Sequence, residues 1–214
     1  MNKKVLLSII LSAFIAFSSI AQQIELTPYY GYTLNGKIRT YYGDYSVGNN
    51  PNFGAILSIE LMENKFIELS YNRNETDFKY VRGPITYTSV DMGVEYYQIG
   101  SIQQIDINEK IKGFGGVSIG ATRFIPKDSY DWDGDGIVTS LNDVWSFSAT
   151  IGAGLKIYIS DRVGIRLQAR LLMPMQFEGL FIGIGSGGAS GGASFSVPLI
   201  AGDFNAGLVL RLGK

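Results

Sequence analysis

The chain has 214 residues, a formal net charge of −1, and neither histidine nor cysteine. The near-neutral charge gives no signature of nucleic-acid binding. The absence of cysteine excludes a disulfide framework and lipid attachment through a cysteine. The absence of histidine excludes a Ser–His or Cys–His pair as a catalytic nucleophile and its base, so the composition argues against the commonest hydrolytic enzymes.

The first 21 residues have the anatomy of a signal peptide. Lys3 and Lys4 form a basic start, residues 5–17 are largely apolar, and Ser19, Ile20 and Ala21 end the segment in a small-x-small pattern. The apolar run is short for a membrane-spanning helix, although an uncleaved anchor is the alternative. We predict a signal peptide at residues 1–21 and a mature domain at residues 22–214. The mature part holds 16 basic and 19 acidic residues, a net charge of −3.

Strict alternation of apolar and polar residues recurs along the mature part. It is clearest at residues 163–171, where every odd position is apolar and even positions carry Arg166, Gln168 and Arg170. A period of two predicts a β-strand with one apolar and one polar face. The predicted strands are residues 24–34, 53–61, 66–73, 89–102, 111–124, 145–158, 163–171 and 204–212.

The connections between these strands alternate in length. Tight turns are predicted at residues 62–65, 106–109 and 160–162. The long connections are residues 35–52, 74–88, 125–144 and 174–203. Short periplasmic turns and long outer loops are typical of outer-membrane barrels, so both termini are expected on the periplasmic side.

The polar face of the strands indicates which way the apolar face points. A secreted lipocalin-like barrel, with apolar residues inside, has the same alternation. The polar face here is rich in Gly, Ser and Thr and carries charges of both signs in mid-strand, which suits a narrow lumen. These charges are Glu60, Glu68, Asp91, Glu95, Lys156, Arg166, Arg170 and Arg211. We therefore predict an all-β, eight-stranded, antiparallel up-and-down transmembrane β-barrel.

The predicted lumen charges have two interpretations. They form a salt-bridged plug that fills the barrel, or they line a conductive path. An eight-stranded barrel is only wide enough for side chains to fill it, which favours the plug.

An acidic segment in the third long connection resembles the calcium loops of EF-hand and dockerin type. Asp131, Asp133 and Asp135 occupy relative positions 1, 3 and 5, a glycine follows at position 6, and Ile137 offers its backbone carbonyl. Position 12 is Asn142 in place of an acid, and Asp143 follows. The two interpretations are a Ca²⁺ site that stabilises this loop and an ion-free acidic loop.

The last long connection contains a glycine-rich run at residues 183–192. No helix pattern follows it, so a phosphate-binding loop is not expected, and a flexible loop is the simplest interpretation. Its apolar flanks are Phe177, Leu180, Phe181, Ile182 and Phe195. These flanks leave three alternatives open: they bind a partner, extend the strands or fold over the barrel mouth.

In its strand pattern the chain resembles the small outer-membrane β-barrels of the OmpA-transmembrane-domain and OmpW-like type, and its Ala21–Gln22 junction is similar to exported proteins of Bacteroidetes-type bacteria. The resemblance implies a barrel in the bacterial outer membrane, surrounded by outer-membrane lipid. We expect a non-enzymatic protein that acts in envelope structure, or as a partner subunit of other outer-membrane proteins through its outer loops. The alternative is a narrow OmpW-like conduit for small apolar solutes.

Overall fold

The computed structural model describes residues 23–40, 43–82, 85–127, 129–130, 139–140, 143–185, 188–196 and 200–212. The predicted signal peptide at residues 1–21 lies outside these residues. In the described part of the chain, no helix has the length and hydrophobicity needed to cross a membrane.

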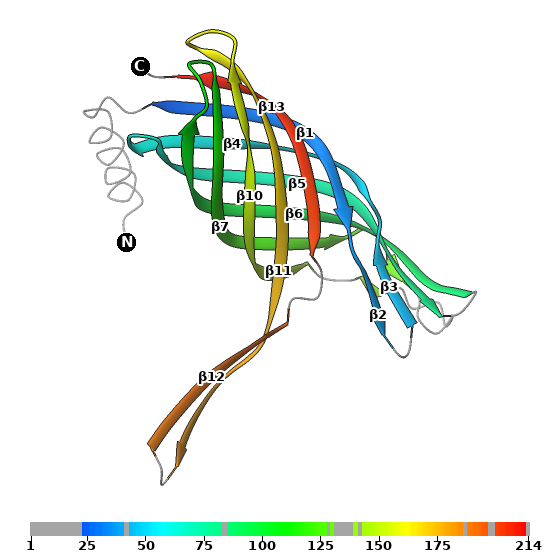
Figure 1. Cartoon of the computed structure of the whole chain (residues 1–214). Helices are drawn as coiled ribbons and strands as arrows, with labels where there is room; N and C mark the ends of the chain where they lie inside the picture. Colours follow the sequence, from blue (N-terminus) through cyan, green and yellow to red (C-terminus); the bar gives the residue numbers. More distant parts are fainter. Residues whose placement is uncertain are drawn as a thin grey trace, which may run out of the picture.

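Eight antiparallel strands close into a barrel (Figure 1), as the alternation predicts. Each strand pairs with its neighbours around the wall, and the first strand, β1, pairs with the last, β13. In order around the wall, the strands are β1 (Ile24–Asn35), β4 (Asn50–Met62), β5 (Lys65–Arg82), β6 (Ile85–Asp106), β7 (Ile111–Pro126), β10 (Val144–Tyr158), β11 (Val163–Gly185) and β13 (Ala201–Arg211). The predicted eight-stranded up-and-down barrel is confirmed.

The stagger of the strands determines how much space the barrel encloses. Paired residues lead once around the wall from Glu95 through Arg73, Phe53, Tyr30, Ala206, Leu167, Leu155 and Gly113 to Ile105. The path returns to β6 ten positions from its start, so the barrel has a shear number of 10. Eight tilted strands enclose an interior that side chains can fill completely.

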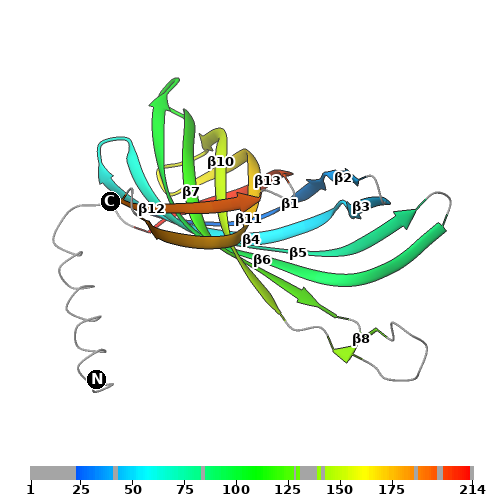
Figure 2. The ribbon, with the colours of Figure 1, turned by 90° about the horizontal axis from the view of Figure 1, so that it is seen from below.

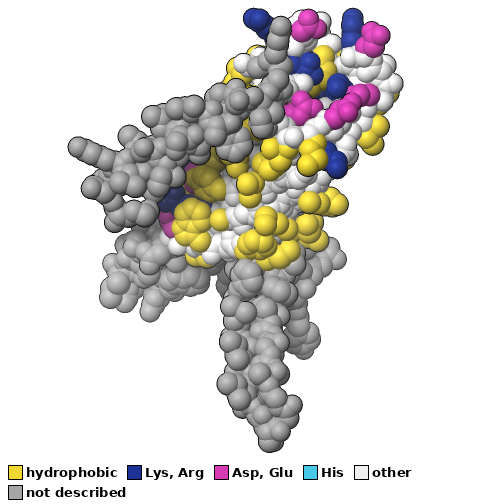
Figure 3. All heavy atoms as spheres, turned by 90° about the vertical axis from the view of Figure 1, so that its left-hand side faces the viewer, with side chains coloured by type: hydrophobic (Ala, Val, Ile, Leu, Met, Phe, Trp, Pro, Cys, Tyr) yellow, Lys and Arg dark blue, Asp and Glu magenta, His cyan; other side chains and the backbone are white. Residues whose placement is uncertain are grey.

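The apolar face of the strands points outward over most of the wall. Leu69, Ile99, Ile119 and Ile151 lie on neighbouring strands and are about half exposed. Figure 3 shows hydrophobic side chains gathered on the wall of the barrel and charged side chains gathered toward the top of that view. An exposed apolar wall around a polar interior is the arrangement of a barrel that is surrounded by lipid.

Three tight turns join the strands at one end of the barrel, which we call the turn end. At the first turn, Asn64 adopts a φ of 62°, a left-handed conformation that asparagine tolerates well. At the second, the Asn108 side chain accepts hydrogen bonds from the backbone N–H groups of Lys110 and Ile111. At the third, the Ser160 hydroxyl accepts one from the N–H of Val163. All three predicted turns are confirmed.

At the opposite end, the loop end, three of the predicted long connections contain further strands. The added strands are β2 (Lys37–Thr40), β3 (Gly43–Val47), β8 (Ser129–Tyr130), β9 (Thr139–Ser140) and β12 (Gly188–Ser196). β3 pairs with the end of β5, so β2, β3, β5 and β6 form a sheet beyond the barrel. β11 continues past the barrel and pairs with β12 as a projecting ribbon (Figures 1 and 2).

Two predictions about these connections are therefore wrong. The connection predicted at residues 74–88 is mostly strand, because β5 runs to Arg82 and β6 begins at Ile85. The glycine-rich segment is a β-ribbon and not a flexible loop, since backbone pairing continues to Gly185 and Gly188. Of the three alternatives for its apolar flanks, the structure agrees with the one in which they extend the strands.

Candidate functional site

The lumen is filled by cations that each have two kinds of partner. Every one of four interior basic side chains pairs with a carboxylate and lies against an aromatic ring. The four sets are Lys156 with Glu25 and Phe66, Arg166 with Glu68 and Phe114, Arg170 with Asp203 and Tyr29, and Arg211 with Glu25 and Tyr158. Buried charges need such pairing, because an unpaired ion in a medium of low dielectric constant is very costly.

The set nearest the turn end is organised around Glu25, which is completely buried. The Lys156 Nζ lies 2.6 Å from one carboxylate oxygen, and the Tyr158 hydroxyl donates to the other at 2.8 Å. The Arg211 Nε lies 3.3 Å from the same carboxylate, and its guanidinium carbon is 3.6 Å from the centroid of the Tyr158 ring. Lys156, also completely buried, lies 4.7 Å from the centroid of Phe66. This set closes the lumen at the turn end.

The middle set is an arginine fork on a carboxylate. The two terminal nitrogens of Arg166 donate to the two carboxylate oxygens of Glu68 at 2.5 and 3.0 Å. The Ser58 hydroxyl donates to Glu68 at 2.8 Å, and the guanidinium lies 4.2 Å from the centroid of Phe114. Gln168 accepts from the Arg166 Nε at 2.8 Å. Bidentate pairs of this kind combine strength with a fixed geometry.

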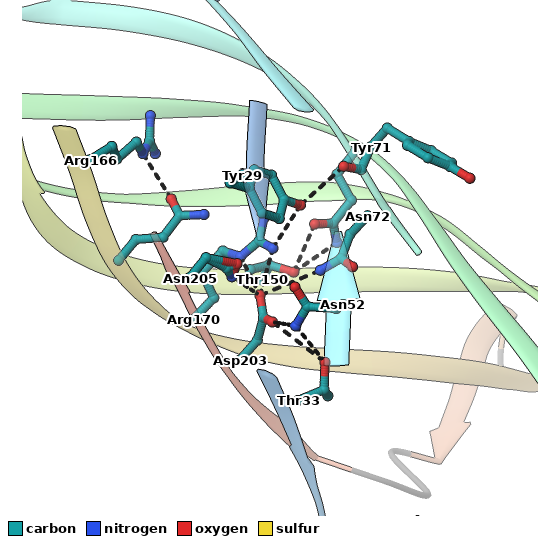
Figure 4. Close-up of polar contacts among 12 residues, drawn as sticks. Tyr29, Thr33, Asn52, Tyr71, Asn72, Thr150, Arg166, Arg170, Asp203 and Asn205 are labelled. Atoms are coloured by element: carbon teal, nitrogen blue, oxygen red, sulfur yellow. Dashed lines mark hydrogen bonds and ion pairs between the residues drawn. The ribbon is translucent and has the colours of Figure 1, made fainter. Parts of the chain in front are cut away.

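The third set surrounds Asp203 near the loop end (Figure 4). Arg170 donates to its carboxylate through Nε at 2.7 Å and also to the Tyr29 hydroxyl at 3.0 Å. Three asparagine amides from three strands add hydrogen bonds to the same carboxylate: Asn52 at 2.5 Å, Asn72 at 3.4 Å and Asn205 at 2.7 Å. A carboxylate with this many donors is fully compensated without water.

Above the third set, one side of the interior is apolar, whereas Asn74 and Thr76 of β5 keep buried polar side chains at the same level. Val94, Tyr96, Leu172 and Ala201 form a buried cluster, with Met92 and Phe124 packed against it. The cluster joins β6 to β11 and β13 across the interior. It covers the charged layers on the loop side.

The structure places the sequence-predicted lumen residues in three different environments. Glu68, Lys156, Arg166, Arg170 and Arg211 lie in the interior sets described above. Glu60 lies at the turn end, where its carboxylate accepts the N–H of Asn64 at 3.2 Å.

Asp91 and Glu95 are not in the lumen, and this part of the prediction is wrong. Glu95 is paired in register with Arg73 and Arg123 on the outer face of the wall, and Asp91 is exposed on the same outward row. The reason is a reversal of polarity at the loop end of β6. There the apolar residues Val94 and Tyr96 point inward and the acids point outward.

Glu25 and Asp203 are the lumen carboxylates that sequence reasoning missed. Both obey the alternation: Glu25 is followed by the inward residues Thr27 and Tyr29, and Asp203 precedes Asn205 by two positions. The signal was therefore present in the polar face of each strand. Asp203 was lost because the last strand begins at Ala201, three residues before its predicted start.

Most of the predicted calcium loop lies outside the described residues: Asp131, Asp133, Asp135, Ile137 and Asn142. Asp143 is described, and its carboxylate accepts from Arg123 Nε at 2.9 Å. Among the residues that the structure describes, no group of three or more histidine, cysteine or acidic side chains could hold a metal ion.

A closed antiparallel wall of eight strands, apolar outside and charged inside, defines the chain as a small transmembrane β-barrel of the outer-membrane type. Comparison with solved structures agrees. The outer-membrane protein OprG of Pseudomonas aeruginosa is similar with a TM-score of 0.60 and 9% identity, over 91% of this chain and 97% of OprG. Neisserial surface protein A has a TM-score of 0.54 and 11% identity, over 90% of this chain and 98% of its own. At these identities the likeness shows the fold alone. No protein-family model and no curated protein sequence matches the chain.

Proposed function

We propose that the protein is a non-enzymatic, closed outer-membrane barrel that acts in envelope structure or as a partner subunit of a larger outer-membrane assembly. The observation that carries this proposal is the filling of the lumen. Four cations, three carboxylates and four aromatic rings occupy three successive layers of an eight-stranded interior, and an apolar cluster covers them. Each of these carboxylates is engaged by a cation, so it supports the wall and is not poised as an acid or base.

The parts offered to a partner are the strands that project beyond the barrel. The β2–β3–β5–β6 sheet and the β11–β12 ribbon expose backbone edges at the loop end. Edge strands are templates for pairing with another chain. Purification from native outer membranes in mild detergent, with and without residues 176–196, tests this role. Loss of a stoichiometric partner on deletion would support it, and an identical set of co-purified proteins would contradict it.

Planar-bilayer recording tests the closed lumen. We expect no steady conductance from the folded protein, because every layer of the interior is occupied. A reproducible single-channel conductance, or flux of a solute into protein-loaded vesicles, would overturn the proposal.

The second candidate function is a narrow conduit for small apolar solutes. The apolar cluster around Tyr96 and Leu172 at the loop end of the lumen favours it, since such a surface is compatible with an apolar solute. The same vesicles separate the two functions: uptake of an apolar solute without ion conductance would favour the conduit.

The same proposal includes the cellular location of the protein. We infer an exported chain that is cleaved after Ala21 and has both termini in the periplasm. Mass spectrometry of the protein purified from outer membranes would then find an N-terminus at Gln22. A protease added to intact cells would cut the loop end and spare a tag at the C-terminus.

A further inference from the structure

The apolar part of the outer face of β6 is short. Between Glu95 and Ser101 only Tyr97 and Ile99 point outward, and both are exposed. Ser101 and Gln103 then expose polar side chains on the same outward row. A strand tilted by about 40° advances roughly 2.5 Å per residue along the barrel axis. The interval from Glu95 to Ser101 therefore covers roughly 15 Å, whereas the apolar band of membrane barrels is about 25 Å tall.

The neighbouring strands support a polar limit on the turn side of this face. Gln103 is paired in register with Lys65 of β5, which is also exposed on the outward row. On its other side it is paired with Gly115 of β7, which adds no apolar side chain. Ile105 and Ile107 lie beyond this level, at the turn end. Polar side chains of two adjacent strands thus mark where the apolar surface ends.

The loop-side limit of the same face is charged on both strands. Arg73 donates to Glu75 at 2.8 Å and to Glu95 at 2.9 Å. Ionised groups are costly in hydrocarbon, so this level belongs to headgroups or water. On β5, the interval from Lys65 to Arg73 covers roughly 20 Å. The outward charges at and above this limit are Arg73, Glu75 and Asp77 on β5 and Asp91 and Glu95 on β6.

The other side of the wall has a taller apolar face. On β13, which lies four strands from β6 in the order around the wall, every outward residue from Phe204 to Leu212 is apolar. On β11 the apolar row runs from Val163 to Met175 and covers roughly 30 Å. Its outward residues are Val163, Ile165, Leu167, Ala169, Leu171, Met173 and Met175.

The register shows which residues of the two faces lie at the same level. A shear number of 10 over eight strands raises the line of paired residues by about 1.25 residues at each strand. Because Ala169 of β11 is three strands along this line from Gln103, Ile165 lies at the level of Gln103. By the same rule Met173 lies at the level of Glu95. The line runs from Gln103 through Gly115 and Ala153 to Ala169.

A tilt of the barrel does not explain the difference between the faces, because tilt moves both limits of one face in the same direction. On β6 the loop-side limit is lower, and the turn-side limit is higher, than on β11. We propose that the face formed by β5 and β6, which we call the short face, borders phospholipid in a locally thinned bilayer. Lipid accommodates a short apolar surface by thinning, at a modest cost for each ångström of mismatch. This inference rests on the membrane-barrel fold and not on the closed lumen or the projecting strands.

Spin labels at two positions of equal level test the thinning. The chain has no cysteine, so the Gln103→Cys and Ile165→Cys variants each carry a single nitroxide. The folded full chain would be placed in dioleoylphosphatidylcholine bilayers, and collisions with oxygen, which concentrates in hydrocarbon, would be compared with those of a water-soluble nickel chelate. The ratio of oxygen to nickel collisions should be several-fold lower at residue 103 than at residue 165.

Two results from the labels would overturn the proposal. Equal, oxygen-dominated ratios at residues 103 and 165 would mean that hydrocarbon of ordinary thickness covers both faces. An immobilised label at residue 103 that neither reagent reaches would mean that protein, such as a second copy of the chain, covers the short face in place of lipid.

Lengthening the apolar row of β6 gives an independent test. The Ser101→Leu, Gln103→Leu double variant extends this row to Ile105, so it should raise the urea midpoint of unfolding in dioleoylphosphatidylcholine vesicles. It should leave the midpoint unchanged in vesicles of the shorter dilauroylphosphatidylcholine, whose hydrocarbon already matches the short face. Lys110→Leu in the second turn is the control and should change neither midpoint. A rise of equal size in both lipids, or no rise in the longer lipid, would contradict a thinned bilayer at this face.

Discussion

Arg170 and Asp203 form a buried ion pair that joins β11 to β13 inside the barrel, 2.5 Å apart at their closest atoms. The guanidinium also donates to Tyr29 of β1, so one side chain connects three strands, including the two that close the wall. This relationship makes the closure of the barrel depend on the charges in its lumen.

Replacing Arg170 by Ala should therefore destabilise the barrel strongly. The substitution leaves the Asp203 carboxylate buried without a cation, for which a cost of about 3–5 kcal/mol is expected. Urea unfolding of the protein in detergent micelles measures the free energy. Arg162→Ala in the exposed third turn is the matched control and should change it by less than about 0.5 kcal/mol. Equal unfolding midpoints for the two variants would contradict a structural role for the pair.

The strand pattern predicted most of this site because it assumes an apolar outer face and a polar inner face, and this arrangement holds along most of the wall. Between Leu155 and Leu171 lipid lies outside and a polar lumen inside, so alternation places Lys156, Arg166 and Arg170 inward, as the structure has them. The same rule fails at Asp91 and Glu95, since in this stretch of β6 the apolar residues Val94 and Tyr96 are the ones that point inward. Alternation gives the two faces of a strand but not which face points inward at each level of the barrel.

The pairing of charges could not be predicted from single strands. Glu25 and Lys156 are 131 residues apart and meet only because the barrel closes between β13 and β1. Likewise, nothing local in residues 37–47 gives the register with β5, which is set by pairing between Val47 and Phe78. Contacts that depend on closure or on a distant strand need the three-dimensional structure.

The Glu25–Lys156 pair should show strong energetic coupling. Lys156→Met alone removes the nearest cation from a completely buried carboxylate, and a loss of about 3–5 kcal/mol is expected. The double substitution Glu25→Gln with Lys156→Met removes both charges, and the thioether fits beside the Phe66 ring. The double variant should be more stable than Lys156→Met. A double-mutant cycle of urea unfolding measures the coupling, and simple additivity of the two substitutions would argue against it.

Two adjacent glycines on β7 should differ sharply in their tolerance of alanine. A β-carbon at Gly116 would overlap the carbonyl oxygen of Ser101 on β6, whereas the nearest atom to one at Gly115 is 3.8 Å away. Gly116→Ala is expected to cost about 1–3 kcal/mol, because the paired strands must separate. Gly115→Ala should be nearly neutral. The temperature at which the folded band on a semi-native gel converts to the unfolded band compares them, and equal temperatures would mean that β6 and β7 are not so closely packed.

The acidic segment after β8 carries the remaining prediction, that it binds Ca²⁺ through Asp131, Asp133 and Asp135. The carboxylates at positions 1, 3 and 5 supply the oxygen ligands that Ca²⁺ prefers. Asp143 already accepts a hydrogen bond from Arg123 and is not one of these three ligands. With a weak twelfth position, we expect a dissociation constant of about 10⁻⁴–10⁻³ M, the range of extracellular modules. Isothermal titration of the detergent-solubilised protein measures it, with the Asp131→Asn, Asp133→Asn, Asp135→Asn triple variant as control. The variant should show no binding heat while its barrel melts as before, because the flanking strands of the wall end at Pro126 and begin at Val144. Identical titrations for the two proteins would remove the site.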